Sequence, residues 1–219
     1  MFLGHFSVGF AAKALAPRTS LGSLFLASQL LDLVWSTLLI FGIERVRLDP
    51  GVTGAVPLNF EYYPFSHSLS LALIWGVVVA AIYLVVSNYT RGAIVMGLVV
   101  VSHWFLDLLV HRSDLPLYPG GRLFGMGLWD SKSGTVVVEM VIFIVSLGVY
   151  FNATATRKDG GDWCLGCLLL VLMGIYIESL FGPLPPSVNV IAWGGEAQWL
   201  LIAWGYWIER HRVSVDPER

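Results

Sequence analysis

The sequence predicts an all-α bundle of membrane-spanning helices. Of its 219 residues, 56% are hydrophobic and only 13% are charged, whereas a soluble domain carries roughly 25% charged residues. The mean hydropathy is +0.73. A soluble globule of this composition would expose large apolar patches and aggregate. The composition therefore excludes a soluble enzyme and a disordered chain, and a net charge of −2 gives no sign of a nucleic-acid partner.

Six stretches approach the roughly 20 apolar residues that a membrane helix requires. The last is the weakest, because it contains Glu196, Gln198 and a Gly-Gly pair. Residues 1–16 are apolar but shorter, so we expect a short N-terminal helix that is re-entrant or packed against the bundle. The prediction is five to six transmembrane helices and this short helix. The six stretches are residues 20–43, 68–87, 92–110, 133–152, 163–182 and 190–207.

Proline and glycine separate these stretches, most densely between residues 116 and 127. The chain shows no internal repeat, so we expect one membrane-embedded domain over residues 1–219 with a short charged tail at 209–219. Two cysteines cannot form a disulfide framework. Cys164 and Cys167, at the start of a stretch, are interpreted as packing residues.

The basic residues are divided unequally between the two sides of the predicted membrane protein. If the N-terminal helix does not cross, eight Lys and Arg residues share one side and five share the other. Cytoplasmic loops are the ones richer in Lys and Arg. We therefore expect loops 44–67 and 111–132 on the extracytoplasmic side.

Ionisable side chains within the apolar stretches are the candidates for function, because each costs roughly 2.5–3.5 kcal/mol on insertion scales. His103, Asp107 and His111 stand at i, i+4 and i+8, a spacing that places them on one helix face. His67 begins the second stretch, on the same side of the membrane as the end of the third. These four residues are therefore predicted to lie near one another.

Two further residues extend this set. Asp32 lies midway along the first stretch, and His5 lies near the N-terminus. Histidine and aspartate together are ligands for zinc and related divalent ions. A cation also explains how carboxylates stay ionised in a low-dielectric bundle, where they would otherwise protonate or pair. The alternative is that these side chains form separate hydrogen bonds between helices.

Two segments resemble motifs of a known family. Ser102-His103-Trp104-Phe105-Leu106-Asp107 resembles the Ser-His-x-x-x-Asp motif of the YdjM-type inner-membrane metal-dependent hydrolases. Phe65-Ser66-His67-Ser68-Leu69 resembles their Thr-His-Ser-Leu motif. His5 and Asp32 follow the family's order, although Leu30-Leu31-Asp32-Leu33-Val34 lacks the usual Pro and second Asp. The resemblance covers roughly residues 1–140 and implies a multi-pass protein of the inner membrane.

The family is more remotely similar to the zinc-dependent phospholipases C, all-helical enzymes with up to three metal ions. That likeness implies zinc, in one to three ions. His67, His103 and Asp107 would hold one ion, and Asp32 with His5 would approach a second. His111 and Glu139 would belong to a third site or support the other two.

The implied reaction is hydrolysis of a phosphoester or lipid by a metal-activated water. Asp32 or Asp107 would orient or deprotonate the water, and His111 would serve a neighbouring metal or the substrate. Arg112 and Arg122, in the adjoining loop, could bind a phosphate or anchor the loop at the interface. Membrane lipids are the expected partners, and nothing in the sequence indicates an oligomer.

Three other classes use the same residue types. An ion- or proton-coupled transporter would use the intramembrane His, Asp and Glu residues as a relay. A membrane haem protein would use paired histidines as ligands. A non-catalytic membrane protein would use them for contacts between helices.

Overall fold

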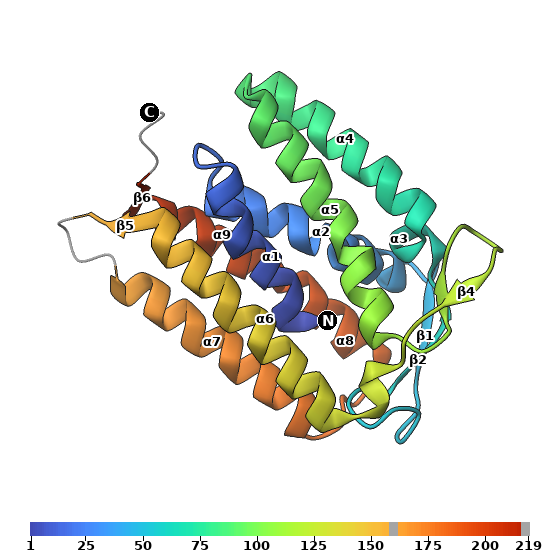
Figure 1. Ribbon diagram of the computed structural model, residues 1–219. Coiled ribbons are helices and arrows are strands. Elements are labelled where there is room, and N and C mark those ends of the chain that lie inside the picture. The colour runs from blue at the N-terminus through green and yellow to red at the C-terminus, as the bar shows by residue number, and fades with distance from the viewer. Residues whose placement is uncertain (158–161, 216–219) are drawn as a thin grey trace.

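The computed structural model describes residues 1–157 and 162–215 and shows a helical bundle built around its N-terminal helix (Figure 1). Among the basic residues counted above, Lys158 and Arg219 lie outside these ranges, as does the end of the predicted tail. The helices are α1 (Phe2–Leu15), α2 (Leu21–Ile40), α3 (Pro64–His67), α4 (Leu69–Ser87), α5 (Thr90–Val110), α6 (Lys132–Ala153), α7 (Asp162–Phe181), α8 (Val188–Glu196) and α9 (Gln198–Glu209).

The short helix α1 lies inside the bundle, packed against α2, α5 and α6. Its phenylalanines supply much of the contact, because Phe6 and Phe10 are fully buried. Both rings meet Phe25 of α2 edge-on, with centroids 5.1 Å and 4.9 Å apart. Because α1 is enclosed by other helices, it can be apolar although it is too short to cross a membrane.

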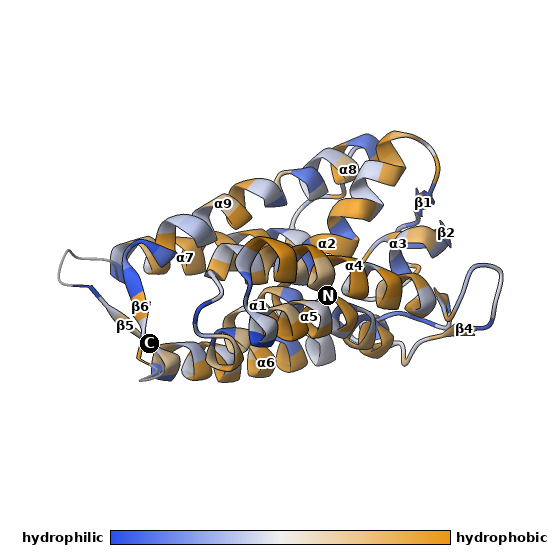
Figure 2. Ribbon diagram, turned by 90° about the horizontal axis from the view of Figure 1, so that it is seen from above, coloured by the Kyte–Doolittle hydropathy of each residue, from blue (hydrophilic) through white to orange (hydrophobic). Residues whose placement is uncertain are grey.

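Five helices of the described chain are long and apolar enough to cross a membrane, namely α2, α4, α5, α6 and α7. Figure 2 shows apolar residues along these helices and polar residues gathered in the loops at both ends. The helix α4 packs mainly on α5. Gly76 and Gly97 allow this close approach, because a Cβ on either glycine would lie 2.9 Å from the carbonyl oxygen of the other.

The predicted sixth stretch is not one helix but two short ones, α8 and α9, separated at Ala197. Both pack against α2. A side chain at Gly195 would collide with the Ser36 hydroxyl, and Glu196 accepts a hydrogen bond of 2.7 Å from Thr37. Gly195 and Glu196 thus fit the chain closely to α2, where two short helices replace the continuous helix that hydropathy alone indicated.

Short two-stranded ribbons occupy the connecting loops, although the sequence showed no strand pattern. Two ribbons lie at the end of the bundle that also carries α3, and the third lies at the opposite end (Figures 1 and 2). All three are antiparallel and satisfy backbone groups in the loops. They are β1 (Arg45–Leu48) with β2 (Leu58–Tyr62), β3 (Leu115–Pro116) with β4 (Leu123–Phe124), and β5 (Thr154–Thr156) with β6 (Arg212–Ser214).

Candidate metal centre

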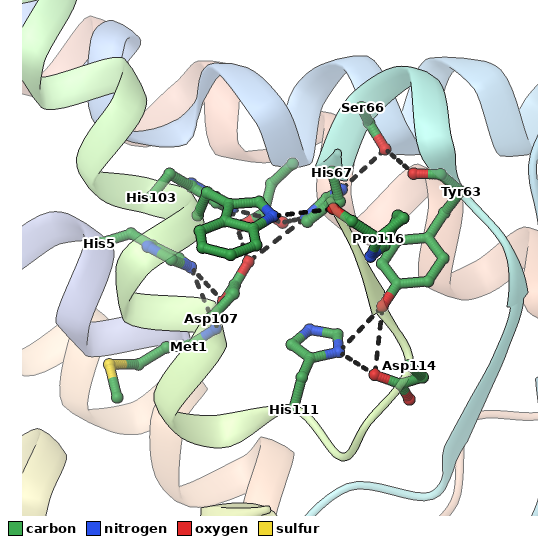
Figure 3. A network of polar contacts seen from close by, with 12 residues as sticks. Met1, His5, Tyr63, Ser66, His67, His103, Asp107, His111, Asp114 and Pro116 are labelled. Atoms are coloured by element: carbon green, nitrogen blue, oxygen red, sulfur yellow. Dashed lines mark hydrogen bonds and ion pairs between the residues drawn. The ribbon is translucent and has the colours of Figure 1, made fainter. Parts of the chain in front are cut away.

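Histidine and aspartate side chains from α1, α2, α3 and α5 converge inside the bundle (Figure 3). They form two overlapping groups that could hold a metal ion, and within each group the ligand atoms lie within 4.8 Å of one another. The groups share His103. One consists of His5, His103 and Asp107, and the other of Asp32, His67 and His103.

The helix α5 supplies the centre of this arrangement. His103 and Asp107 are one turn apart, so they share a face, and His103 Nε2 lies 3.1 Å from Asp107 Oδ2. Both side chains are about 1% exposed. Despite this proximity, His103 Nε2 has no hydrogen-bond partner among the described residues. A buried nitrogen without a partner is costly, and a bound cation would satisfy it.

His67 and Asp32 approach the same point from two other elements. His67 is the last residue of α3, a single turn that starts at Pro64, where the fixed φ of proline favours a helix. Its Nε2 lies 3.6 Å from Asp107 Oδ2 and 3.5 Å from Asp32 Oδ1. Asp32, on α2, also lies 3.6 Å from His103 Nε2. These distances bring the predicted residues together, but the predicted division between two ions differs from the two groups: Asp32, not Asp107, joins His67 and His103, and Asp107 joins His5.

Hydrogen bonds to Nδ1 orient both central histidines. His103 Nδ1 donates to the Ser28 carbonyl at 2.8 Å. The Ser66 hydroxyl donates to Glu44 Oε2 at 2.6 Å, so it accepts from His67 Nδ1 at 2.7 Å. Each histidine thus turns Nε2 toward the carboxylates, as metal-ligating histidines with an anchored second nitrogen do.

Sequence reasoning missed Glu44. It is 1% exposed and also accepts the backbone N–H groups of Phe65 and Ser66, at 2.7 Å and 3.0 Å. In the sequence, a glutamate just beyond an apolar stretch resembles any loop residue. Only the structure shows that Glu44 is buried and contacts the turn that carries His67.

His5 completes the first group from α1. Its ring stacks on that of His103 with centroids 3.5 Å apart, and its Nε2 lies 3.1 Å from Asp107 Oδ1. The α-amino group of Met1 lies 2.9 Å from the same oxygen. Asp107 is therefore shared, with Oδ1 toward α1 and Oδ2 toward His67 and His103.

Glu139 and His111 belong to neither group. Glu139 Oε2 accepts the N–H groups of Leu3 and Gly4, at 2.9 Å and 3.3 Å, at the beginning of α1. His111 is the C-cap of α5: its N–H still donates to the Asp107 carbonyl, and its φ of −62° is helical, so its side chain keeps the predicted face. It lies two turns beyond His103, which explains why it shares a face with His103 and Asp107 but joins neither group.

The two predicted phosphate-binding arginines lie away from the groups. Arg112 is half exposed, donates to the Val52 carbonyl at 2.8 Å and lies 3.7 Å from Asp130. Arg122 is exposed on its loop. The large cavity beside the two groups is lined by Asp32, His67 and Asp107 but by neither arginine.

That cavity has a volume of about 750 Å³ and adjoins the candidate ligands Asp32, His67 and Asp107. Most of its other walls are apolar side chains of α7, α8 and α9. Three buried polar atoms on its lining residues, Trp35 Nε1, Tyr176 Oη and Gln198 Oε1, have no hydrogen-bond partner in the described chain. The apolar walls include Val171, Ile175, Val190, Ile191, Leu200 and Leu201.

Neither a family model, nor a curated protein, nor a solved structure matches this chain. The fold and the site therefore define its class by themselves. It is an all-α bundle with five apolar helices of membrane-spanning length and buried His and Asp groups that could hold a metal ion.

Proposed function

We infer that this protein is a membrane-embedded, metal-dependent hydrolase that acts on a lipid phosphoester. One observation carries the inference: the buried Nε2 atoms of His67 and His103 converge on Asp32 and Asp107 beside a large, mainly apolar cavity. The resemblance of residues 65–69 and 102–107 to the YdjM-type hydrolases supports the same reading.

Zinc is the ion that fits the donor set best. Three imidazoles, which are borderline nitrogen ligands, together with two carboxylates suit zinc better than magnesium or calcium, which prefer oxygen alone. The two groups share His103, so one or two ions agree with the geometry more closely than three. A bound ion there would lower the pKa of water and polarise a phosphoryl oxygen.

The chain's own residues would orient the reactants. Asp32 is the least buried of the candidate ligands, with a side chain 25% exposed, and it lines the cavity. It is therefore the carboxylate best placed to accept a proton from the attacking water. Asp107, 2% exposed and shared by three histidines, would serve as a ligand.

The cavity favours a substrate with both polar and apolar parts. Its apolar walls would bury an alkyl chain, at roughly 25 cal/mol per Å² of apolar surface. The unpartnered donors Trp35 Nε1 and Tyr176 Oη would hydrogen-bond the oxygens of a phosphoryl group. A water-soluble phosphoester would leave the apolar walls unused.

A multi-pass position in the inner membrane agrees with the five apolar helices. The loop segments 44–67 and 111–132 lie at the end of the bundle that carries α3 and the end of α5 (Figure 1). The excess of Lys and Arg in the other loops favours an extracytoplasmic location for this end. The site would then face substrates in the outer leaflet.

Elemental analysis of the purified protein, followed by a hydrolysis assay on phospholipids and lipid phosphates, tests this proposal. We expect zinc in the protein and hydrolysis that a chelator abolishes and zinc restores. Metal-free protein, or ion flux through liposomes without hydrolysis, would contradict it, and the latter result would favour a transporter.

A further inference from the structure

His111 occupies the point at which α5 ends, and its backbone is held from two sides. Its N–H donates to the Asp107 carbonyl at 2.8 Å, and its own carbonyl accepts the Gly127 N–H at 2.7 Å. A Cβ on Gly125 would collide with the carbonyls of His111 and Arg112. Glycine at position 125 lets the loop pack directly on this turn. These contacts fix the backbone of His111, from which the imidazole extends.

The imidazole ring itself is also constrained. Its centroid lies 4.4 Å from that of Trp129 and 4.7 Å from that of Phe60. His111 Nδ1 lies 3.0 Å from Asp114 Oδ1 and 3.3 Å from the Tyr63 hydroxyl. That hydroxyl donates to the same Asp114 oxygen at 3.2 Å. Burial and the charge of Asp114 raise the pKa of Tyr63 well above its ordinary value, so the phenol stays a donor.

The Asp114 carboxylate decides which nitrogen of His111 carries the hydrogen. An ionised carboxylate only accepts hydrogen bonds, so Nδ1 is the donor and Nε2 remains for another partner. Figure 3 shows the second ring nitrogen turned toward the open space between Asp107 and His67. All three residues line the cavity.

His111 faces the candidate metal centre without belonging to it. Its ring centroid lies 6.5 Å from that of His67, and it is absent from both ligand groups. A histidine that is oriented by a carboxylate through Nδ1 and directs Nε2 toward the reacting region matches the pairing that hydrolases use for proton transfer. Asp32 is already assigned to the attacking water, so the leaving group is the partner that remains for His111.

We propose that His111 is the general acid of the hydrolysis, acting as the imidazolium whose Nδ1–H is held by Asp114 and whose Nε2–H faces the leaving group, an assignment that rests on the function proposed above. The water oxygen bonds to phosphorus while Asp32 takes the water proton. The phosphorus–oxygen bond to the leaving group breaks, and the proton on His111 Nε2 passes to the leaving oxygen. The products are an alcohol and a phosphate, and a proton moving from Asp32 to His111 through water restores both groups.

Comparing two leaving groups tests the proton transfer from His111 separately from the rest of the reaction. Two dodecyl phosphodiesters serve as probes, one with p-nitrophenol and the other with ethanol as the second alcohol. Nitrophenolate departs without a proton, whereas ethoxide requires one. Asp114→Asn and His111→Gln should therefore lower kcat/KM for the ethyl ester about 100-fold or more relative to the nitrophenyl ester, the scale of general acid catalysis.

A matched control tests whether the substitution itself matters. Asp130→Asn makes the same change at a neighbouring loop aspartate whose side chain is 56% exposed and does not line the large cavity. The ratio of the two kcat/KM values should be unchanged in this variant. All three variants should keep the wild-type metal content, because none of the altered residues belongs to a ligand group.

A spectroscopic readout tests the positioning role without turnover. In nitrogen-15 NMR of histidine-labelled protein, recorded at a pH where the ring is neutral, the His111 signal, assigned by its loss in His111→Gln, should report hydrogen on Nδ1. Asp114→Asn should shift this hydrogen toward Nε2. Equal slowing of both esters, or an unchanged tautomer, overturns the assignment and leaves the proposed hydrolase standing. If the wild-type protein hydrolyses neither ester in the presence of metal, both proposals are overturned.

Discussion

Glu44 lies 2.6 Å from the hydroxyl of Ser66, and through this hydroxyl it sets which nitrogen of His67 faces Asp32 and Asp107. Such contacts behind a ligand typically change metal affinity 10- to 100-fold when they are lost. Glu44→Gln keeps the size of the side chain but can donate to Ser66. The Ser66 hydroxyl is then free to donate to His67 Nδ1, which would favour the other tautomer of His67.

We therefore expect Glu44→Gln to raise the dissociation constant for zinc about 10- to 100-fold, measured by competition with a chromophoric chelator. Glu61→Gln, at an exposed strand position with a side chain 47% exposed, is the matched control and should bind zinc as the wild type does. Equal affinity in the two variants would show that Glu44 does not act through His67.

Substitution of Glu139 distinguishes a structural role from a metal-binding role. Glu139→Ala should leave the metal content unchanged and lower the free energy of unfolding by about 1–3 kcal/mol, because the N–H groups of Leu3 and Gly4 would be buried without an acceptor. Thermal unfolding in detergent measures the loss, with Glu178→Ala, an exposed glutamate of α7, as the comparison. Loss of metal in Glu139→Ala would instead make it a ligand.

The contact between α4 and α5 predicts opposite effects for two identical substitutions. Gly97→Ala places a Cβ 2.9 Å from the Gly76 carbonyl oxygen and should lower the free energy of unfolding by about 1–3 kcal/mol through overpacking. Gly148→Ala, on α6, meets nothing within 4 Å and should be neutral or stabilising by up to about 1 kcal/mol. Comparable stabilities of the two variants would argue against the tight helix pair.

The orientation can be tested by cysteine labelling of intact cells in a Cys167→Ala background. A cysteine in place of Arg122, at the end of the bundle near the site, should react with an impermeant maleimide. A cysteine in place of Ala155, on the ribbon at the opposite end (Figure 1), should react only after permeabilisation. The reverse pattern would place the site on the cytoplasmic side.

Hydropathy and helical spacing predicted the parts of this structure that depend on local sequence. His103 and Asp107 share a face because they are one turn apart, and this pairing followed from their spacing alone. The five long apolar helices followed from composition. His111 shows the limit of such reasoning, since its contact with Asp114 depends on how the chain turns after α5 ends at Val110.

The remaining features depend on tertiary contacts that carry no local signal. Glu44 and Asp114 lie in polar loops, where acidic residues are common, and only their contacts with Ser66 and His111 give them a role. The division of the last apolar stretch at Ala197 arises from close packing of Gly195 against Ser36 of α2. Sequence reasoning could not foresee which helix would approach that glycine.

The metal content of His103→Ala tests the central claim most directly, because His103 belongs to both candidate ligand groups. We predict that the purified wild-type protein contains zinc and that His103→Ala loses it while keeping its helical circular dichroism spectrum. His211→Ala, which alters a histidine outside both groups, should retain the wild-type zinc content. Full zinc content in His103→Ala would contradict the account and would make these histidines hydrogen-bonding residues between helices.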